Sequence, residues 1–196
     1  MIKRSFDIAV SSLALLVCAP FFLLIAALVK LDSKGPVFFA QRRIGKNFRP
    51  FWIYKFRSMV EDAPRQGGPI TFGEDTRITR VGGFLRKTKL DELPQLVNVL
   101  RGEMSLVGPR PEVPKYVLLF WNDYEEILCV HPGITDLASL KYRDEAALLA
   151  EFANPEQEYV EHVLPDKIKL AKEYVRKSSF FFDLGLILRT PLRLFT

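Results

Sequence analysis

The feature that most constrains this chain of 196 residues is one long hydrophobic segment close to its N-terminus. From Ile8 to Val29 there are 22 consecutive uncharged residues, of which only two serines and Pro20 are not apolar. A straight helix of this length is ~33 Å long and would cross a hydrocarbon layer of ~30 Å. The segment is longer than the core of a signal peptide, and no small-residue cleavage site follows it. We therefore expect an uncleaved helix that contacts a membrane.

Two topologies are compatible with this helix. Its length favours a single crossing of the membrane, whereas Pro20 near its centre removes a backbone hydrogen bond and favours a break. Basic residues flank both ends, with Lys3 and Arg4 before the segment and Lys30 and Lys34 after it. Such residues tend to stay on the cytoplasmic side, and a helix that enters and leaves the same leaflet would keep all of them there. These residues alone leave both topologies open.

The remainder of the chain has the composition of a soluble domain. The whole sequence is 48% hydrophobic and 26% charged, with a net charge of +5. These values exclude intrinsic disorder, a collagen-like repeat, a disulfide scaffold and a transporter with many spans. The two cysteines lack CxxC spacing, which predicts a reducing compartment and no structural zinc.

Short strands and amphipathic helices are predicted in this remainder, giving a mainly helical α+β fold. Residues 34–59 carry seven basic residues and no acidic one, and their aromatic runs predict strands at 37–39 and 51–54 with a turn at 45–47. The other predicted elements are a polar loop over 61–75, a helix over 79–87 capped by Thr79, a helix over 114–124, a turn at 131–135 and an amphipathic helix over 164–176. Residues 180–188 form an apolar helix, either interfacial on a membrane or buried in the core.

An acidic pair stands at the start of another predicted helix. In residues 90–102 the apolar side chains recur at helical spacing, Pro94 fits only the first turn, and Gly102 fits the end. The structural interpretation makes Asp91 an N-cap and Glu92 a partner of the helix dipole. We expect an aspartate in this position to remain ionised.

Basic residues near this pair in the sequence are candidates for binding phosphate. Lys55 and Arg57 directly follow an aromatic strand, and Arg110 stands between two prolines that hold its backbone extended. A guanidinium with a fixed direction suits two-point binding of phosphate or carboxylate. Contact with solvent or with anionic lipid headgroups is the alternative for each of them.

Four motifs taken together resemble the bacterial sugar transferases, which are monotopic phosphoglycosyl transferases. They are KRSFD at 3–7, YKFRSM at 54–59, LDELPQLVNVL at 90–100 and SLVGPRP at 105–111. The resemblance runs from residue 3 to about residue 135 and continues more weakly to residue 183. It implies transfer of a phospho-sugar from a nucleotide-diphosphate sugar, usually a UDP-sugar, to undecaprenyl phosphate with release of UMP. This reaction is the first membrane step of a bacterial glycan pathway.

The resemblance also implies roles for the candidate residues. Asp91 and Glu92 match a catalytic dyad that works with Mg²⁺, and both are expected metal-site residues. Asp91 would be the nucleophile that forms a covalent phospho-sugar intermediate, and Glu92 would place Mg²⁺ or activate the acceptor. The residues expected to bind the substrate phosphates are Lys55, Arg57, Arg110 and Arg143.

The family topology favours a re-entrant, Pro-broken helix with both ends cytoplasmic. Residues 1–34 are then a membrane helix–break–helix, and residues 35–196 a cytoplasmic catalytic domain with interfacial helices, at the bacterial inner membrane. The expected partners are a nucleotide-sugar donor, a polyprenyl phosphate acceptor and membrane lipids. Formation of a homodimer is compatible with the sequence, and no nucleic acid is expected as a partner.

The chain resembles the minimal catalytic form of the family, but it departs from the usual pattern at one place. Residues 136–139 read DLAS where many members have GLAQ, which affects the expected sugar and nucleotide contacts more than the dyad. The alternative to an enzyme is a catalytically silent scaffold or anionic-lipid binder at the membrane surface.

Overall fold

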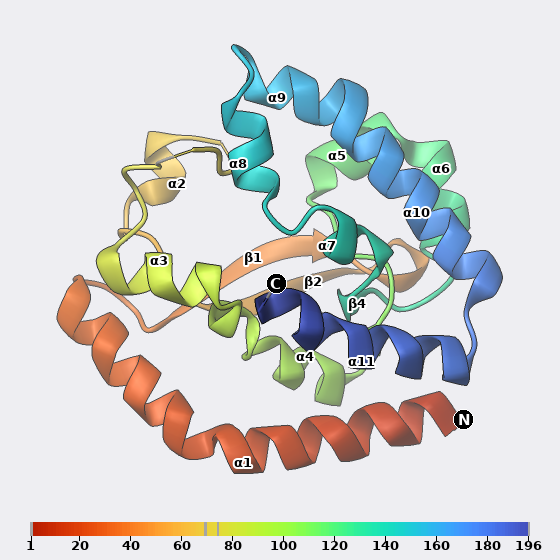
Figure 1. Cartoon of the computed structure of the whole chain (residues 1–196), viewed down its shortest axis with the longest axis horizontal. Helices are drawn as coiled ribbons and strands as arrows, with labels where there is room; N and C mark the ends of the chain where they lie inside the picture. Colours follow the sequence, from red (N-terminus) through yellow and green to blue (C-terminus); the bar gives the residue numbers. More distant parts are fainter. Residues whose placement is uncertain (1, 69, 74, 196) are drawn as a thin grey trace.

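The computed structural model describes residues 2–68, 70–73 and 75–195 and has the predicted mainly helical α+β fold. The helix α1 lies along one edge, and the other elements gather on one side of it (Figure 1). The helices are α1 (Ile2–Asp32), α2 (Ala63–Gln66), α3 (Arg80–Lys87), α4 (Gln95–Arg101), α5 (Pro114–Leu119), α6 (Trp121–Ile127), α7 (Leu137–Lys141), α8 (Glu145–Ala150), α9 (Pro155–Glu158), α10 (Leu164–Lys177) and α11 (Phe180–Phe195). The strands are β1 (Phe38–Ile44), β2 (Pro50–Phe56), β3 (Ser105–Val107) and β4 (Gly133–Thr135), and shorter helical turns are η1 (Lys46–Phe48), η2 (Leu90–Glu92) and η3 (Tyr159–Val163).

The helix α1 is continuous over 31 residues, with Pro20 inside it. The family resemblance favours a break at this proline, whereas the structure has a bend near the middle of a continuous helix (Figure 1). A proline inside a helix removes one hydrogen bond and kinks the axis, and the turns on either side keep their own bonds.

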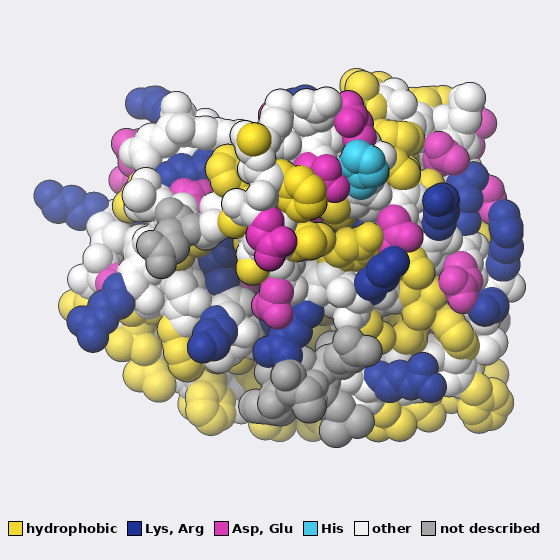
Figure 2. All heavy atoms as spheres, turned by 45° about the horizontal axis from the view of Figure 1, so that its top comes forward, with side chains coloured by type: hydrophobic (Ala, Val, Ile, Leu, Met, Phe, Trp, Pro, Cys, Tyr) yellow, Lys and Arg dark blue, Asp and Glu magenta, His cyan; other side chains and the backbone are white. Residues whose placement is uncertain are grey.

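Most of the apolar surface of α1 is exposed. Leu16 and Leu23, one on each side of Pro20, are 74% and 75% exposed. Hydrophobic side chains accordingly gather along the lower edge of the molecule in Figure 2. By length and composition α1 could cross a membrane, and very little of its apolar stretch is buried by the rest of the protein.

Polar contacts hold the first turns of α1 against the domain. The Lys3 ammonium donates to the Tyr174 hydroxyl at 2.8 Å and pairs with the Asp183 carboxylate at 2.5 Å. One turn later the buried Asp7 accepts a hydrogen bond from Ser105 Oγ at 2.8 Å. These contacts join α1 to α10, α11 and β3.

The last turn of α1 is held by a second set of contacts. Arg57, which follows β2, donates to the carbonyl oxygens of Ser33 and Lys34, at 2.7 Å each. Asp32 accepts a hydrogen bond from the backbone N–H of Val81 in the first turn of α3 at 2.9 Å. Both ends of the bent helix are therefore attached to the same domain.

Two small sheets lie above α1. The predicted hairpin is confirmed: β1 pairs antiparallel with β2 from Phe38↔Phe56 to Ile44↔Pro50, and both strands are longer than predicted. The second sheet was not predicted, because its strand β4 occupies the segment expected to be a turn and pairs in parallel with β3. The β3–β4 approach is so close that a Cβ on Gly133 would lie 2.0 Å from the backbone nitrogen of Gly108.

The core forms in separate clusters, one of which packs against the turn η2 that carries Asp91 and Glu92. Val29 of α1, Phe56 of β2 and Leu85 of α3 pack together, with Leu90 and Leu93 against them. This cluster places η2 directly over the end of α1. A larger cluster between α5, α6, α8 and α10 fills the part of the domain farther from α1 (Figure 1).

Several helix predictions are confirmed and one is wrong. The Thr79 side chain caps α3 by accepting from the backbone N–H of Gly82, and α10 matches the predicted amphipathic helix. The predicted helix over 114–124 is instead two helices, because the backbone of Phe120 leaves the helical region. In α11, Leu186 is buried whereas Phe181 is 82% exposed, so this helix packs on the core with one side only.

Two neighbouring glycines of α3 give a test of this packing. A Cβ on Gly82 would lie 2.0 Å from the carbonyl oxygen of Ser58, whereas a Cβ on Gly83 would meet only the Ile78 side chain at 3.9 Å. We expect Gly82→Ala to lower the free energy of unfolding by about 1–3 kcal/mol, because backbone must move. Gly83→Ala should raise it by about 0.5–1 kcal/mol through helix propensity. Thermal unfolding of both variants in the same detergent checks this, and equal melting temperatures would contradict it.

Candidate active site

Two cationic side chains from distant parts of the chain meet at the Glu92 carboxylate. Lys55 Nζ donates to Glu92 Oε1 at 2.8 Å, and Arg110 binds both carboxylate oxygens, with Nη1 at 3.2 Å from Oε2 and Nη2 in contact with Oε1. Burial alone would raise the pKa of Glu92, but the charges of Arg110 and Lys55 hold it well below its usual value. Glu92 is thus a buried carboxylate that remains ionised and neutralised by two cations.

Lys55 reaches Glu92 because an asparagine ties its strand to α4. The buried side chain of Asn98 accepts a hydrogen bond from the backbone N–H of Tyr54 at 3.1 Å and donates to the carbonyl oxygen of Trp52 at 2.7 Å. These bonds satisfy two backbone groups on the edge of β2 that β1 does not cover. Burial lowers the pKa of Lys55, an effect that the Glu92 carboxylate opposes.

The local backbone explains how the acidic pair is presented. Lys89 adopts a left-handed conformation with φ of 58°, and the chain then turns through η2 into α4. The acidic pair therefore lies just before a helix, as predicted. Asp91 is inside this turn rather than capping it, because the capping position of η2 belongs to Lys89.

Asp91 has a different environment from Glu92, although the two are adjacent. It is 6% exposed, and its Oδ1 atom has no hydrogen-bond partner within the described part of the chain. Burial raises the pKa of Asp91, and the positive charge of Lys55 only partly opposes this. That Asp91 is ionised stays a prediction, because burial raises its pKa whereas the charges of nearby cations lower it.

Sequence reasoning missed one cation of this site. The half-buried Arg86, in the last turn of α3, is close enough to Asp91 for the two charges to interact, although burial lowers the pKa of Arg86. The only signal in the sequence was its place five residues before Asp91 in a basic helix end.

The four predicted phosphate-binding residues do not all come together. Lys55 and Arg110 meet at Glu92, as described above. Arg57 is buried, and both terminal nitrogens of its guanidinium donate to carbonyl oxygens at the end of α1 rather than to Glu92. Arg143 is half-buried in the segment before α8. Its binding of a substrate phosphate stays a prediction.

The acidic pair fits a metal ion only in part. The unpartnered Oδ1 of Asp91 is an oxygen of the kind that Mg²⁺ takes as a ligand. Both oxygens of Glu92 are occupied by Lys55 and Arg110. Within the described residues no three acidic, histidine or cysteine side chains form a group that could hold a metal.

Chemically, this arrangement suits an anionic substrate. The buried carboxyl of Asp91, with one oxygen that has no partner among the described residues, is close to the positive charges of Lys55 and Arg86, whose N–H groups can donate to phosphate oxygens. The site also lies beside the end of the apolar helix α1, since Leu90 and Leu93 pack against the cluster that contains Val29.

The comparisons with known proteins agree with this class of site. The whole chain, residues 1–196, matches the model of the family described as bacterial sugar transferase. The chain therefore belongs to the bacterial sugar transferase family.

Particular relatives are similar over nearly the whole of this chain. An undecaprenyl-phosphate glucose phosphotransferase of Komagataeibacter xylinus is 41% identical over 97% of this chain and 35% of its own length. An N-acetylgalactosaminephosphotransferase of Aeromonas hydrophila, which acts on undecaprenyl phosphate by its name, is 37% identical over 96% of this chain and 42% of its own. The exopolysaccharide production protein ExoY of Rhizobium meliloti is 38% identical and is matched over 84% of its length. The chain thus spans well under half of the first two relatives.

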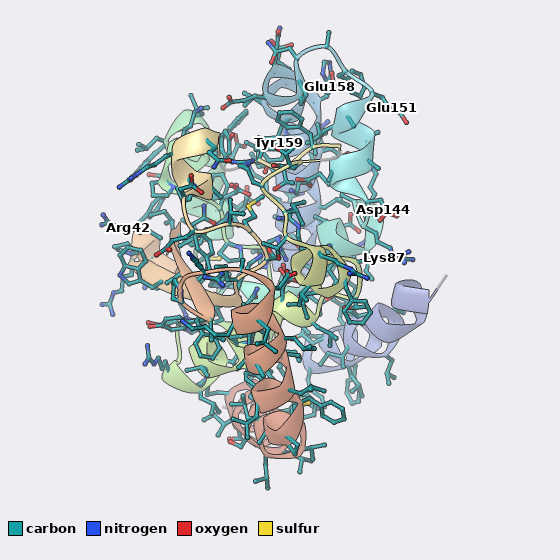
Figure 3. All side chains as sticks on the ribbon, turned by 90° about the vertical axis from the view of Figure 1, so that its left-hand side faces the viewer. Arg42, Lys87, Asp144, Glu151, Glu158 and Tyr159 are labelled. Carbon is teal, nitrogen blue, oxygen red and sulfur yellow. The ribbon has the colours of Figure 1, made fainter. Side chains whose placement is uncertain are left out.

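The position of Arg57 gives a prediction that separates structure from phosphate binding. We expect Arg57→Gln to lower the free energy of unfolding by about 3 kcal/mol, because a buried cation with several hydrogen bonds is lost and carbonyl oxygens are left unpaired. Arg42→Gln is the control, since Arg42 lies in the same hairpin with its side chain exposed (Figure 3). Chemical unfolding measures both. If Arg57→Gln destabilised the protein no more than Arg42→Gln, the structural role of Arg57 would be contradicted and phosphate binding would be favoured.

Proposed function

We propose that this protein transfers a sugar phosphate from a nucleotide-diphosphate sugar to a polyprenyl phosphate. The observation that carries the proposal is the buried carboxyl of Asp91, whose Oδ1 has no hydrogen-bond partner among the described residues, beside a cation cluster at the end of an apolar helix. Membership of the bacterial sugar transferase family supports it. Relatives named UDP-glucose:undecaprenyl-phosphate glucose-1-phosphate transferase, such as that of Escherichia coli at 36% identity, support a UDP-sugar donor and an undecaprenyl phosphate acceptor.

The proposed reaction has two displacements at the same phosphorus atom. In the first, a carboxylate oxygen of Asp91 attacks the phosphorus that carries the sugar, and the bond to the bridging oxygen breaks. The nucleoside monophosphate leaves with that bond's electron pair, and an aspartyl phospho-sugar remains. In the second, a phosphate oxygen of the polyprenyl phosphate attacks the same phosphorus and displaces the Asp91 carboxylate, which restores the enzyme.

Charge is the main obstacle to this reaction, because an anion attacks an anionic diphosphate. At ~4 Å each such pair of unit charges costs about 4 kcal/mol in a surface-like dielectric. Lys55 and Arg110 supply compensating charge, and Glu92 holds both of them in place through its two oxygens. The Arg110 side chain is partly exposed, so part of its donor capacity remains accessible to a phosphate.

Magnesium is part of the proposal through Asp91. Mg²⁺ commonly uses one or two carboxylates and completes its shell with substrate phosphates and water, which fits a site with one unpartnered carboxylate oxygen. When bound, the ion would neutralise negative charge on the diphosphate and favour the ionised form of Asp91, whose pKa burial raises. Glu92 would serve mainly as the anchor of the two cations.

We further propose that α1 enters and leaves a membrane on the same side, with the catalytic domain on the cytoplasmic face. The support is that both ends of the bent helix contact one domain, at Lys3 and Asp7 and again at Asp32. A helix that crossed the membrane would place these ends on opposite faces. The exposed apolar residues near the bend would lie within the leaflet.

The nucleophile assignment can be tested by UMP release. With a UDP-sugar, undecaprenyl phosphate and Mg²⁺, we expect Asp91→Asn to lower UMP release by at least about 10³-fold, because an amide cannot form the acyl phosphate. Asp123→Asn, which removes an exposed carboxylate paired with Lys172, should leave the rate unchanged. Chelation of Mg²⁺ should stop the wild-type reaction.

Two results would count against this assignment. Equal UMP release by wild type and Asp91→Asn would remove the proposed nucleophile. Absence of release by the wild type across a panel of nucleotide sugars would favour the scaffold or lipid-binding alternative.

The topology can be tested with single cysteines at the two ends of α1. In a variant with Cys18 and Cys129 replaced by serine, we expect Ile2→Cys and Lys34→Cys to resist a membrane-impermeant maleimide in intact bacterial cells. Both should react after permeabilisation, because both side chains are exposed on the domain side. Labelling of one position alone in intact cells would indicate a helix that crosses the membrane.

A further inference from the structure

The residues that follow β3 and β4 make a contact that the proposed mechanism does not use. The backbone N–H of Arg110 donates to Asp136 Oδ2 at 3.1 Å. The other carboxylate oxygen of Asp136 accepts from the backbone N–H of Ser139 at 2.7 Å and caps α7. Asp136 is only 3% exposed, so its two oxygens are committed to these two partners within a buried setting.

The parallel pairing of the strands brings these residues together. Val107 of β3 is paired with Thr135 of β4, and the backbone N–H of Gly108 donates to the carbonyl oxygen of Thr135 at 3.1 Å. Arg110 and Asp136 therefore leave adjacent strand ends in the same direction. Since Asp136 is held by β4 through its backbone and by α7 through its side chain, it is a rigid acceptor.

Arg110 depends on this acceptor more than a helical or strand residue would. It lies between the β3 strand and α5, outside both elements, and so has no ladder bond of its own. Its guanidinium donates hydrogen bonds to Glu92, whereas its backbone N–H donates to Asp136. Two anions thus fix the two ends of one residue, and both charges stabilise the cationic form.

We propose that Asp136 is a positioning residue that fixes Arg110 for binding the diphosphate of the nucleotide-sugar donor. The inference rests on the proposed function. Asp136 acts through Arg110 and the substrate need not touch it. The Asp136 carboxylate accepts hydrogen bonds from the backbone N–H groups of Arg110 and Ser139, whereas a glycine at this position would offer no side-chain acceptor to either.

The two substrates give a readout that a purely structural role would not produce. We expect Asp136→Ala to raise the KM for the nucleotide sugar about tenfold, the size expected when a hydrogen bond to a charged group is lost. The KM for undecaprenyl phosphate should stay unchanged. A variant that only loses part of its folded population would show a lower maximal rate with both KM values unaltered.

Matched variants of the full-length protein make the comparison specific. Asp136→Asn retains one side-chain oxygen acceptor and should lie between wild type and Asp136→Ala, and it carries the test if the alanine variant fails to fold. Asn154→Ala is the control, because Asn154 caps α9 through the same kind of side-chain bond, to the backbone N–H of Gln157. It should leave the donor KM unchanged.

Hydrogen exchange provides a readout that does not require turnover. The backbone amide of Arg110 should exchange faster in Asp136→Ala than in wild type, and at the wild-type rate in Asn154→Ala. An unaltered donor KM in a folded Asp136→Ala, or an equal rise in Asn154→Ala, would overturn the proposal, as would unaltered exchange at Arg110. If the wild type released no UMP at all, the proposed function would fail, and exchange at Arg110 would still decide whether Asp136 holds it.

Discussion

The interaction on which the rest of the site depends is the burial of the Glu92 carboxylate between Lys55 and Arg110. A buried carboxylate is costly unless cations and hydrogen bonds compensate it, and here they come from a strand and a loop that are remote in sequence. The pairing therefore requires β2, η2 and the end of β3 to meet at one point. The adjacent Asp91 receives neither of these hydrogen bonds, and within the described residues its Oδ1 atom has no hydrogen-bond partner.

The helix α1 is built into this arrangement rather than attached to it. Its last turn packs under η2 through Val29 and receives the hydrogen bonds of Arg57, which stands two residues after Lys55 in the same chain segment. A displacement of the apolar helix would therefore also shift Lys55, because only one residue separates it from Arg57. This coupling fits the proposed transfer between a water-soluble and a lipid-linked substrate, because the exposed apolar helix and Lys55 are joined through one chain segment.

Much of the fold and of the site could be predicted from local patterns. The apolar helix, the hairpin, the Thr79 cap and the acidic pair at a helix start are confirmed, because each depends on neighbours within a few residues. The predictions that failed have local and distant causes, since the break at Phe120 is local whereas the second sheet depends on a distant strand. The β3–β4 sheet was missed because its strands have three residues each and lie 25 residues apart, too short for a periodic signal.

The sequence by itself determined that this protein has one long apolar helix, a basic hairpin and an acidic pair in four motifs of the bacterial sugar transferase family. Only the tertiary structure decided what each charge does. Arg57 and Lys55 look alike in the sequence, yet one binds the end of α1 and the other binds Glu92. Asp91 and Glu92 are neighbours whose pKa values shift in opposite directions, because burial acts on both whereas hydrogen-bonded cations reach only one. Desolvation and charge pairing depend on which groups surround a side chain in space, and that is settled only when the chain has folded.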